Sequence, residues 1–405
     1  MKILIAPDKF KGSLSAIEVC DALTRGLKKN NSSIEVLSCP MADGGDGSLK
    51  ILNHYFSLKP YELKVNDPLF NTIKSTYYLS QNTAYIEMSL ASGLFLLDEK
   101  DRNCMFTSSI GTGELMNHAI KKGATNINLY VGGSATNDGG IGIASALGFK
   151  FYDASNNLLL PIGKNLILIN RIDKSKVEFN FQELKVKVVT DVNNPLCGKN
   201  GAAYIYGAQK GASQIEIEKL DKGLINLESK LIEHGFESVA KIPGAGAAGG
   251  VGGGAVAFLK AKLVSGIEEF IEITQLESLI KDSDLVITGE GKLDSQTQQG
   301  KVVSGVCNLS KKHNKPIIAV CGDSDRDIYK SLGLKKVYNI LDKTNSISKS
   351  FKKADKYLTL KKNLISLSYN QSMRRSSVFH LQKMAIGFYN LFLLYQIPQY
   401  LSLPD

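Results

Sequence analysis

A cluster of acidic, amide and basic side chains directly follows the apolar run at residues 284–288. The stretch GEGKLDSQTQQGK contains Glu290, Asp294 and Lys301 within a dozen positions. Paired carboxylates can hold a metal ion or orient a hydroxyl group, and a lysine can neutralise charge that develops on a transferred phosphate. The same residues could also occupy an ordinary surface loop. If they form a site, the chemistry that they favour is phosphoryl transfer.

Two loops near the N-terminus have a related composition. In APDKFKGSLSA, Lys9, Lys11 and Ser13 stand just before a predicted helix, whose N-terminus would attract phosphate or carboxylate. In MADGGDGS, Asp43 and Asp46 are separated by glycines, and such carboxylates suit Mg²⁺ or a general base. The alternatives are a helix cap with two surface lysines in the first loop and an Asp-capped tight turn in the second.

Two polar loops also lie in the middle of the chain. VGGSATNDGG has four glycines, more than a plain turn needs, and could present several backbone N–H groups to an anion. Its candidate binding residues are Ser134, Thr136 and Asn137. In TDVNNPLCGKNGA, Asp191 ends an apolar run, although a simple turn accounts for that loop nearly as well.

The segment GAGAAGGVGGGA contains a formal G-x-G-x-x-G at Gly244, Gly246 and Gly249. The segment before it is a poor strand, and no acidic residue ends a strand at the distance that a dinucleotide site requires. We therefore expect these glycines, Gly246 among them, to allow tight helix packing beside a ligand.

Short apolar runs that precede helical segments indicate the strands of a parallel sheet. They stand at residues 2–7, 34–40, 284–289 and 316–322. Strands buried on both faces read as continuous apolar runs, so this alternation predicts an α/β fold with a doubly wound parallel sheet. Residues 61–89 instead alternate polar and apolar side chains, which predicts antiparallel hairpins.

The strand pattern and the length of 405 residues predict two domains. Residues 1–59 and 271–361 would form one discontinuous α/β domain. Residues 60–270 would form a mixed α/β domain inserted into it. A cleft between the two would be the expected ligand site.

Composition excludes several classes of protein. The net charge of +10 comes from lysines scattered along the chain, and no nucleic-acid-binding motif accompanies them, so we expect no nucleic acid partner. Six cysteines without a CxxC pair suit reduced thiols in a cytoplasm. Residues 384–403 contain amides and a proline, so we expect no membrane span. The sequence also lacks a P-loop and the HRD and DFG motifs of protein kinases.

Taken together, the loops resemble one family, the bacterial-type glycerate kinases. The resemblance rests on APDKFKGSLSA, ADGGDGS, VNDPL, IEMSLASGL, IGTGEL, GGSATNDGG, TDVNNPLCG, GAGAAGG and TGEGKLDSQTQQGK, in that order. It implies a flavodoxin-like domain built from both chain ends and an inserted mixed α/β domain. It also implies ATP and Mg²⁺ as cofactors, D-glycerate as substrate, and 2-phosphoglycerate as the favoured product over 3-phosphoglycerate. A homo-oligomer is left open.

The resemblance assigns roles to the loop residues as hypotheses. Asp191 and Glu290 would activate a hydroxyl group or a metal ion, with Asp43 as the competing base, and Lys301 would assist catalysis. Asp46 and Asp294 would hold the metal ion. The residues expected to bind substrate or phosphate are Lys9, Lys11, Ser13, Ser134, Thr136, Asn137 and Gly246.

Residues 362–405 do not resemble the ending of the family and are expected to form a divergent tail. A non-catalytic relative that binds glycerate or nucleotide, inactivated by that altered C-terminus, is therefore one alternative. A nucleotide-dependent oxidoreductase, which rests on the single G-x-G-x-x-G, is another.

Overall fold

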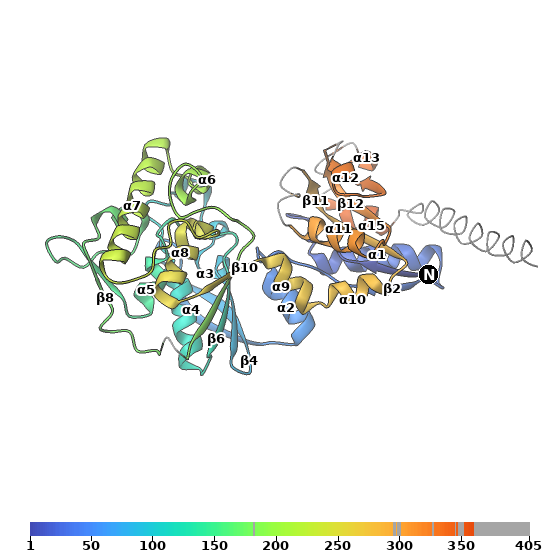
Figure 1. Ribbon diagram of the computed structural model, residues 1–405. Coiled ribbons are helices and arrows are strands. Elements are labelled where there is room, and N and C mark those ends of the chain that lie inside the picture. Colours follow the sequence, from blue (N-terminus) through green and yellow to red (C-terminus); the bar gives the residue numbers. More distant parts are fainter. Residues whose placement is uncertain are drawn as a thin grey trace, which may run out of the picture.

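The computed structural model describes residues 1–180, 183–294, 297, 301–325, 328–344, 346 and 352–359. The predicted divergent tail, residues 362–405, lies outside the described residues. The chain forms two large sheets, each with its own helices, and these make up the two lobes of Figure 1.

The first sheet has five parallel strands drawn from both ends of the chain. They are β1 (Lys2–Ile5), β2 (Glu35–Ser38), β11 (Leu285–Leu293), β12 (Ile317–Ser324) and β13 (Lys336–Asn339). Their spatial order, β13-β12-β11-β1-β2, is the 2-1-3-4-5 order of flavodoxin-like folds, which confirms the predicted fold class. The side chains of Ile3, Leu4 and Ile5 are fully buried because helices cover both faces of this sheet.

Helices from distant parts of the chain cover the two faces. One face packs against α1 (Ala16–Asn30) and α15 (Ala354–Thr359). The helices on the other face are α2 (Ser48–Phe56), α9 (Gly266–Ile273), α10 (Leu276–Lys281) and α11 (Val302–Lys312). Short helices α12 (Ile328–Ser331) and α13 (Leu341–Thr344) flank β13. Helix α1 begins at Ala16 because Ser15 and Glu18 form a capping box.

The second sheet has six strands from the middle of the chain, in the order β10-β9-β6-β5-β4-β3. They are β3 (Lys59–Asn66), β4 (Thr72–Ser80), β5 (Thr83–Glu87), β6 (Asn126–Tyr130), β9 (Lys185–Val189) and β10 (Lys262–Val264). The pairs β3–β4 and β4–β5 are antiparallel, as the alternating pattern predicted, whereas β5, β6, β9 and β10 run parallel. A small two-stranded sheet joins β7 (Lys150–Tyr152) and β8 (Arg171–Asp173).

Helices pack on the six-stranded sheet around a large apolar core. They are α3 (Ser89–Ser92), α4 (Ile110–Lys121), α5 (Ile141–Ala146), α6 (Ala202–Tyr206), α7 (Gln214–Glu233) and α8 (Ala247–Leu259). Helix α8 contains a kink with positive φ from Ala248 to Gly250. At Gly249 a side chain would overlap the carbonyl oxygen of Thr136, so the glycine permits the tight packing expected from the sequence.

The two sheets meet at the carboxyl ends of their parallel strands. Tyr130 and Val189, at the ends of β6 and β9, belong to the same apolar cluster as Leu4 and Val286 of the five-stranded sheet. In parallel α/β sheets, polar groups that follow the carboxyl ends of strands form ligand sites. The loops that the sequence singled out therefore converge on one region.

Two smaller sequence predictions can be compared with the described residues. All six cysteines lie among them, and each is a free thiol. Within the same part of the chain, no helix combines the length and the apolar character needed to cross a bilayer.

Candidate active site

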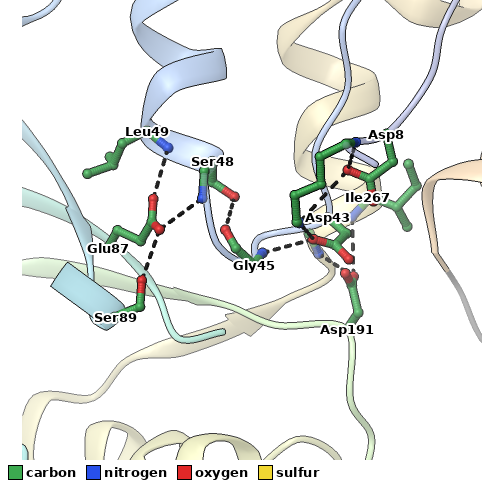
Figure 2. A network of polar contacts seen from close by, with 12 residues as sticks. Asp8, Asp43, Gly45, Ser48, Leu49, Glu87, Ser89, Asp191 and Ile267 are labelled. Atoms are coloured by element: carbon green, nitrogen blue, oxygen red, sulfur yellow. Dashed lines mark hydrogen bonds and ion pairs between the residues drawn. The ribbon is translucent and has the colours of Figure 1, made fainter. Parts of the chain in front are cut away.

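Three loops bring carboxylates and a lysine together where the sheets meet. Asp8 and Lys9 follow β1, Asp43 follows β2, and Asp191 follows β9. We call these four residues the junction cluster; Figure 2 shows Asp8, Asp43 and Asp191 facing one another. Lys9 Nζ lies 3.8 Å from Asp43 Oδ1 and 3.9 Å from Asp8 Oδ1.

Asp191 is held by the first turn of α9. Its Oδ1 accepts hydrogen bonds from the backbone N–H groups of Gly266 (2.8 Å) and Ile267 (3.3 Å). Burial raises the pKa of the Asp191 carboxyl to about 7, and the charge of Asp43 adds to the effect. Its Oδ2 has no hydrogen-bond partner among the described residues.

Asp8 is a member of the cluster that sequence reasoning missed. The residue is only 6% exposed, and its Oδ1 accepts a hydrogen bond from the backbone N–H of Lys9. Burial, followed by the charge of Asp43, raises the pKa of Asp8 to about 7. A carboxylate directly after a strand and beside a candidate lysine was the signal that could have identified it.

Lys9 remains a cation in this setting. Burial opposes the charged form of its ammonium group, yet the carboxylates of Asp8 and Asp43, with smaller contributions from Asp46 and Glu87, raise its pKa above the ordinary value. The cluster thus holds one cation among more carboxylates than it can neutralise.

The stretch after β11 adds a second group of polar side chains. The hydroxyl of Thr297 donates to Glu290 Oε1 (2.7 Å), and the backbone N–H of Asp294 donates to Thr297 Oγ1 (3.1 Å). Burial raises the pKa of Glu290; Lys301 opposes this shift, whereas Asp294 and Asp43 add to it. Lys301 occupies the N-cap position of α11. The charge of Asp43 thus contributes to the raised pKa of Glu290, which links this group to the junction cluster.

The loop MADGGDGS (41–48) and the loop VGGSATNDGG (131–140) touch through glycines. A side chain at Gly133, where φ is +73°, would overlap Asp46 Oδ1, and a Cβ at Gly132 would lie 2.5 Å from the Cα of Gly45. This close approach explains the glycine pair. Asp46 Oδ1 is buried and has no hydrogen-bond partner within the described part of the chain.

Ser134, Thr136 and Asn137 follow this contact in the chain and are nearly or fully buried. The ammonium group of Lys210 donates to Ser134 Oγ (2.9 Å) and to the carbonyl oxygen of Thr136 (2.8 Å). Burial lowers the pKa of Lys210 to about 8. Both polar atoms of the Asn137 amide are buried without a partner among the described residues. Lys210 was missed because nothing in the sequence distinguishes it from the surface lysines.

Gly246 contacts the loop that begins at Asp191. Its backbone N–H donates to the carbonyl oxygen of Asn194 (3.0 Å), and a side chain there would overlap the carbonyl oxygen of Pro195. The structure therefore brings Gly246 against the loop that begins at Asp191, and not into the junction cluster itself.

A cavity of about 380 Å³ opens beside the junction cluster, a volume within the range of small-molecule sites. Side chains from the loops after β1 and β2 and from α2 line it, and these include Asp8, Lys9, Lys11, Ser13, Asp46 and Lys50. Lys50 is not among the residues predicted from the sequence. Four of the predicted residues thus face one space that could hold an anionic ligand.

The carboxylates of these loops fit Mg²⁺, which commonly takes few protein ligands, better than they fit a metal ion whose ligands come mainly from protein side chains. Among the described residues, no group of three or more His, Cys, Asp or Glu side chains has the geometry of a metal centre. Mg²⁺ commonly takes one or two carboxylates, and substrate phosphates and water complete its shell. A cation would satisfy the unpartnered Asp46 Oδ1 and would offset the charge of Asp43, which adds to burial in raising the pKa values of Asp8 and Asp191.

A flavodoxin-like sheet joined to a mixed sheet, with lysines and carboxylates at the strand ends, defines an α/β enzyme suited to phosphoryl transfer. A family model for the glycerate kinase family matches residues 3–368. The chain belongs to the glycerate kinase family.

Relatives match over nearly their whole lengths. A glycerate kinase of Halalkalibacterium halodurans is 39% identical over 364 residues, which cover 88% of this chain and 95% of the relative. A glycerate 2-kinase of Escherichia coli is 41% identical over 358 residues, which cover 87% and 94%. A crystal structure of a glycerate kinase 2 from Salmonella typhimurium LT2 matches with a TM-score of 0.78 at 36% identity. That match covers 92% of this chain and 99% of the other.

The chain is therefore a kinase, a phosphotransferase with an alcohol group as acceptor, and its family implies ATP as the phosphoryl donor. The same match favours the kinase over the oxidoreductase alternative.

Proposed function

We propose that this protein phosphorylates D-glycerate with MgATP and that the C2 hydroxyl is the acceptor, which gives 2-phosphoglycerate. The observation that carries the proposal is the junction cluster, where two carboxyl groups with pKa values of about 7 flank a protonated lysine. The Escherichia coli relative, a glycerate 2-kinase, supports the choice of the C2 hydroxyl.

A carboxylate of the cluster takes the proton of the alcohol. The alcohol oxygen forms a bond to the γ-phosphorus of ATP, and the bond from that phosphorus to the β,γ-bridging oxygen breaks to leave ADP. Asp191 is our first choice of base because its pKa of about 7 suits proton transfer near neutral pH, and because the hydrogen bonds from Ser265, Gly266 and Ile267 all go to its Oδ1. Asp43 is the competing base, and Glu290 supports the same step through its charge.

The remaining residues would bind charge. Lys9, Lys11 and Ser13, which line the cavity, would hold the glycerate carboxylate or the phosphate groups, and Lys301 would neutralise charge on the transferred phosphoryl group. Asp46 and Asp294 would hold Mg²⁺, which offsets the negative charge of the ATP phosphates. Ser134, Thr136, Asn137 and Gly246 would support the loops around this site from within the six-stranded lobe.

The predicted domain division has a structural counterpart in the two sheets, and we propose one adjustment to it. Helix α9 packs with the five-stranded sheet through Ile267 and Phe270, which favours a boundary at Ser265 over one at residue 270. The cytoplasmic location, the absence of nucleic acid and membrane partners, and the homo-oligomer remain predictions.

The test is a steady-state assay of ADP formation with D-glycerate and MgATP, and phosphorus NMR identifies the product. A phosphorus signal split into a doublet by one proton identifies 2-phosphoglycerate, and a triplet identifies 3-phosphoglycerate. Folded protein that binds MgATP and forms no ADP in response to glycerate would contradict the proposal and support the non-catalytic alternative.

A further inference from the structure

Glu87, the last residue of β5, reaches from the six-stranded lobe to the helix that follows the Asp43–Asp46 loop. Its Oε1 accepts a hydrogen bond from the backbone N–H of Gly47 (2.9 Å), and its Oε2 accepts one from Leu49 (3.3 Å). The Ser89 hydroxyl also donates to Oε1 (2.9 Å). Figure 2 shows this carboxylate below the first turn of α2, on the far side of Gly45 from the junction cluster.

Glu87 supplies a cap that α2 lacks in its own sequence. The N-cap residue of α2 is Gly47, which has a left-handed conformation and no side chain with which to accept a hydrogen bond. Uncapped N–H groups at a helix N-terminus attract an anion. Here the anion is an internal carboxylate that is only 3% exposed, so this end of the helix is already occupied.

The contact joins two parts of the molecule that must be aligned. Helix α2 packs through Leu49 and Leu52 in the core of the five-stranded sheet, whereas Glu87 belongs to the other sheet. The loop between β2 and α2 carries Asp43 and Asp46. Gly133 of the six-stranded lobe lies directly against the side chain of Asp46. Moving Gly47 would therefore move the carboxylates that we assign to the site.

We propose that Glu87 is a positioning residue: its carboxylate ties the first turn of α2 to the six-stranded lobe and so fixes the Asp43–Asp46 loop for phosphoryl transfer. This inference rests on the proposed function for its kinetic consequence. It assigns Glu87 no contact with substrate, and it assigns no phosphate group to the N-terminus of α2.

The chain provides a close control for a purely structural effect. Glu228 of α7 is 8% exposed, accepts a hydrogen bond from the Ser238 hydroxyl (2.6 Å), and accepts from the backbone N–H of Val239 (3.2 Å). It is a buried, serine-bound carboxylate like Glu87, but all of its partners lie within the six-stranded lobe.

The experiment compares Glu87→Gln with Glu228→Gln in the glycerate-dependent assay, well below the melting temperature of either variant. We expect Glu87→Gln to lower kcat on the order of 10- to 100-fold because small displacements of reacting groups have effects of that size. Its KM for ATP should stay within about threefold, because Glu87 makes no contact that binds ATP equally in the ground state and the transition state. Glu228→Gln should keep the wild-type kcat despite a similar loss of thermal stability.

A milder pair covers the case in which Glu87→Gln does not fold. Ser89→Ala and Ser238→Ala each remove one hydroxyl donor and leave the carboxylate in place. The first should lower kcat on the order of threefold to tenfold, and the second should not. Equal kinetic effects within either pair would overturn the proposal.

A readout independent of catalysis separates this inference from the proposed function. In Glu87→Gln, amide hydrogen exchange should accelerate across residues 43–50, whereas Glu228→Gln should affect only the segment around Val239. A wild-type protein without kinase activity would contradict the proposed function, and this exchange pattern would still decide whether Glu87 holds the loop. Unchanged exchange over 43–50 would overturn the inference.

Discussion

Two groups of buried charge in this protein look alike in composition and differ in environment. The junction cluster (Asp8, Lys9, Asp43 and Asp191) lies where the two sheets meet. The internal cluster, which we define as Ser109, Asp138 and Lys210, lies inside the six-stranded lobe. Each combines fully or partly buried carboxylate with a lysine, which is buried in the case of Lys210 and partly buried in the case of Lys9.

The internal cluster satisfies its charges with neutral donors and acceptors. The Asp138 carboxylate accepts hydrogen bonds from the hydroxyl and backbone N–H of Ser109 and from the backbone N–H groups of Gly140 and Gly142. In the junction cluster, burial and then the charge of Asp43 raise the pKa values of Asp8 and Asp191, and the carboxylates keep Lys9 protonated. Burial of charge alone therefore does not identify a site here; crowding of like charges does.

The largest difference should appear when one carboxylate of each cluster becomes an amide. Asp191→Asn should lower kcat/KM on the order of a thousandfold, since it removes the proposed base, and should change stability little. Asp138→Asn places an NH₂ group among buried N–H donors and should lower the free energy of unfolding by about 3 kcal/mol. Enzyme assays and urea unfolding of both variants provide the measurement.

The reverse result would contradict this assignment. If Asp138→Asn lost more activity than stability and Asp191→Asn stayed active, the internal cluster would be the reacting one.

Glycine substitutions test the contact between the lobes. Gly133→Ala should lower kcat on the order of tenfold or more because its methyl group overlaps Asp46 Oδ1. Gly123→Ala is the control: its φ of +92° is also unfavourable for alanine, but nothing lies within 4 Å of the added carbon. The control should lose about 1 kcal/mol of stability at wild-type activity. Equal kcat values for the two variants would argue against a role for the Gly133 contact.

The junction cluster should also set a pH dependence of stability. Asp8 and Asp191 have pKa values raised to about 7, so the native state without ligand binds protons that the unfolded chain has released. Their stabilising contribution is complete below about pH 4 and is lost as the pH rises through 7, by up to a few kcal/mol. Urea unfolding at pH 5 and pH 8 without Mg²⁺ measures the change. Asp191→Asn should reduce it, and an unchanged pH dependence in this variant would contradict the shift.

Lys210 should give a smaller effect of opposite sign. Burial lowers its pKa to about 8, so the unfolded chain binds one more proton between pH 8 and about 10.5. Its contribution to stability is therefore complete above that range and is lost as the pH falls through 8. Relative to wild type, Lys210→Met should be more stable at pH 7 than at pH 10, by about 1–3 kcal/mol. A stability difference that does not vary with pH would contradict the lowered pKa of Lys210.

Much of the architecture follows from local sequence pattern. The apolar runs at residues 2–7 and 284–289 became adjacent parallel strands because continuous apolar character requires burial on both faces. The loops after them converge because parallel strands direct their carboxyl ends to the same edge. Composition and position alone therefore predict Asp43, Asp191 and Glu290 as candidate site residues at this edge.

The partners of these residues could not be identified in that way. Ser134 and Asn137 remain predicted ligand contacts, but the sequence did not indicate that both are buried or that Ser134 binds Lys210, which lies 76 residues further along the chain. Glu87 caps a helix 40 residues before it in sequence. Such contacts depend on how two sheets pack, and a lysine or glutamate has the same local pattern whether it is buried or exposed.

The order of the sheets has a consequence for synthesis on the ribosome. Strand β1 pairs with β11, and Thr288 donates its hydroxyl to Ala6 across 282 residues of chain. All six strands of the other sheet lie between them. The inserted lobe can therefore fold as soon as it emerges, whereas β1, whose residues Ile3 to Ile5 are all apolar and buried in the native fold, must wait until nearly three-quarters of the chain has been translated. We expect the N-terminal strands to be the part of the nascent protein most exposed to aggregation and to chaperones.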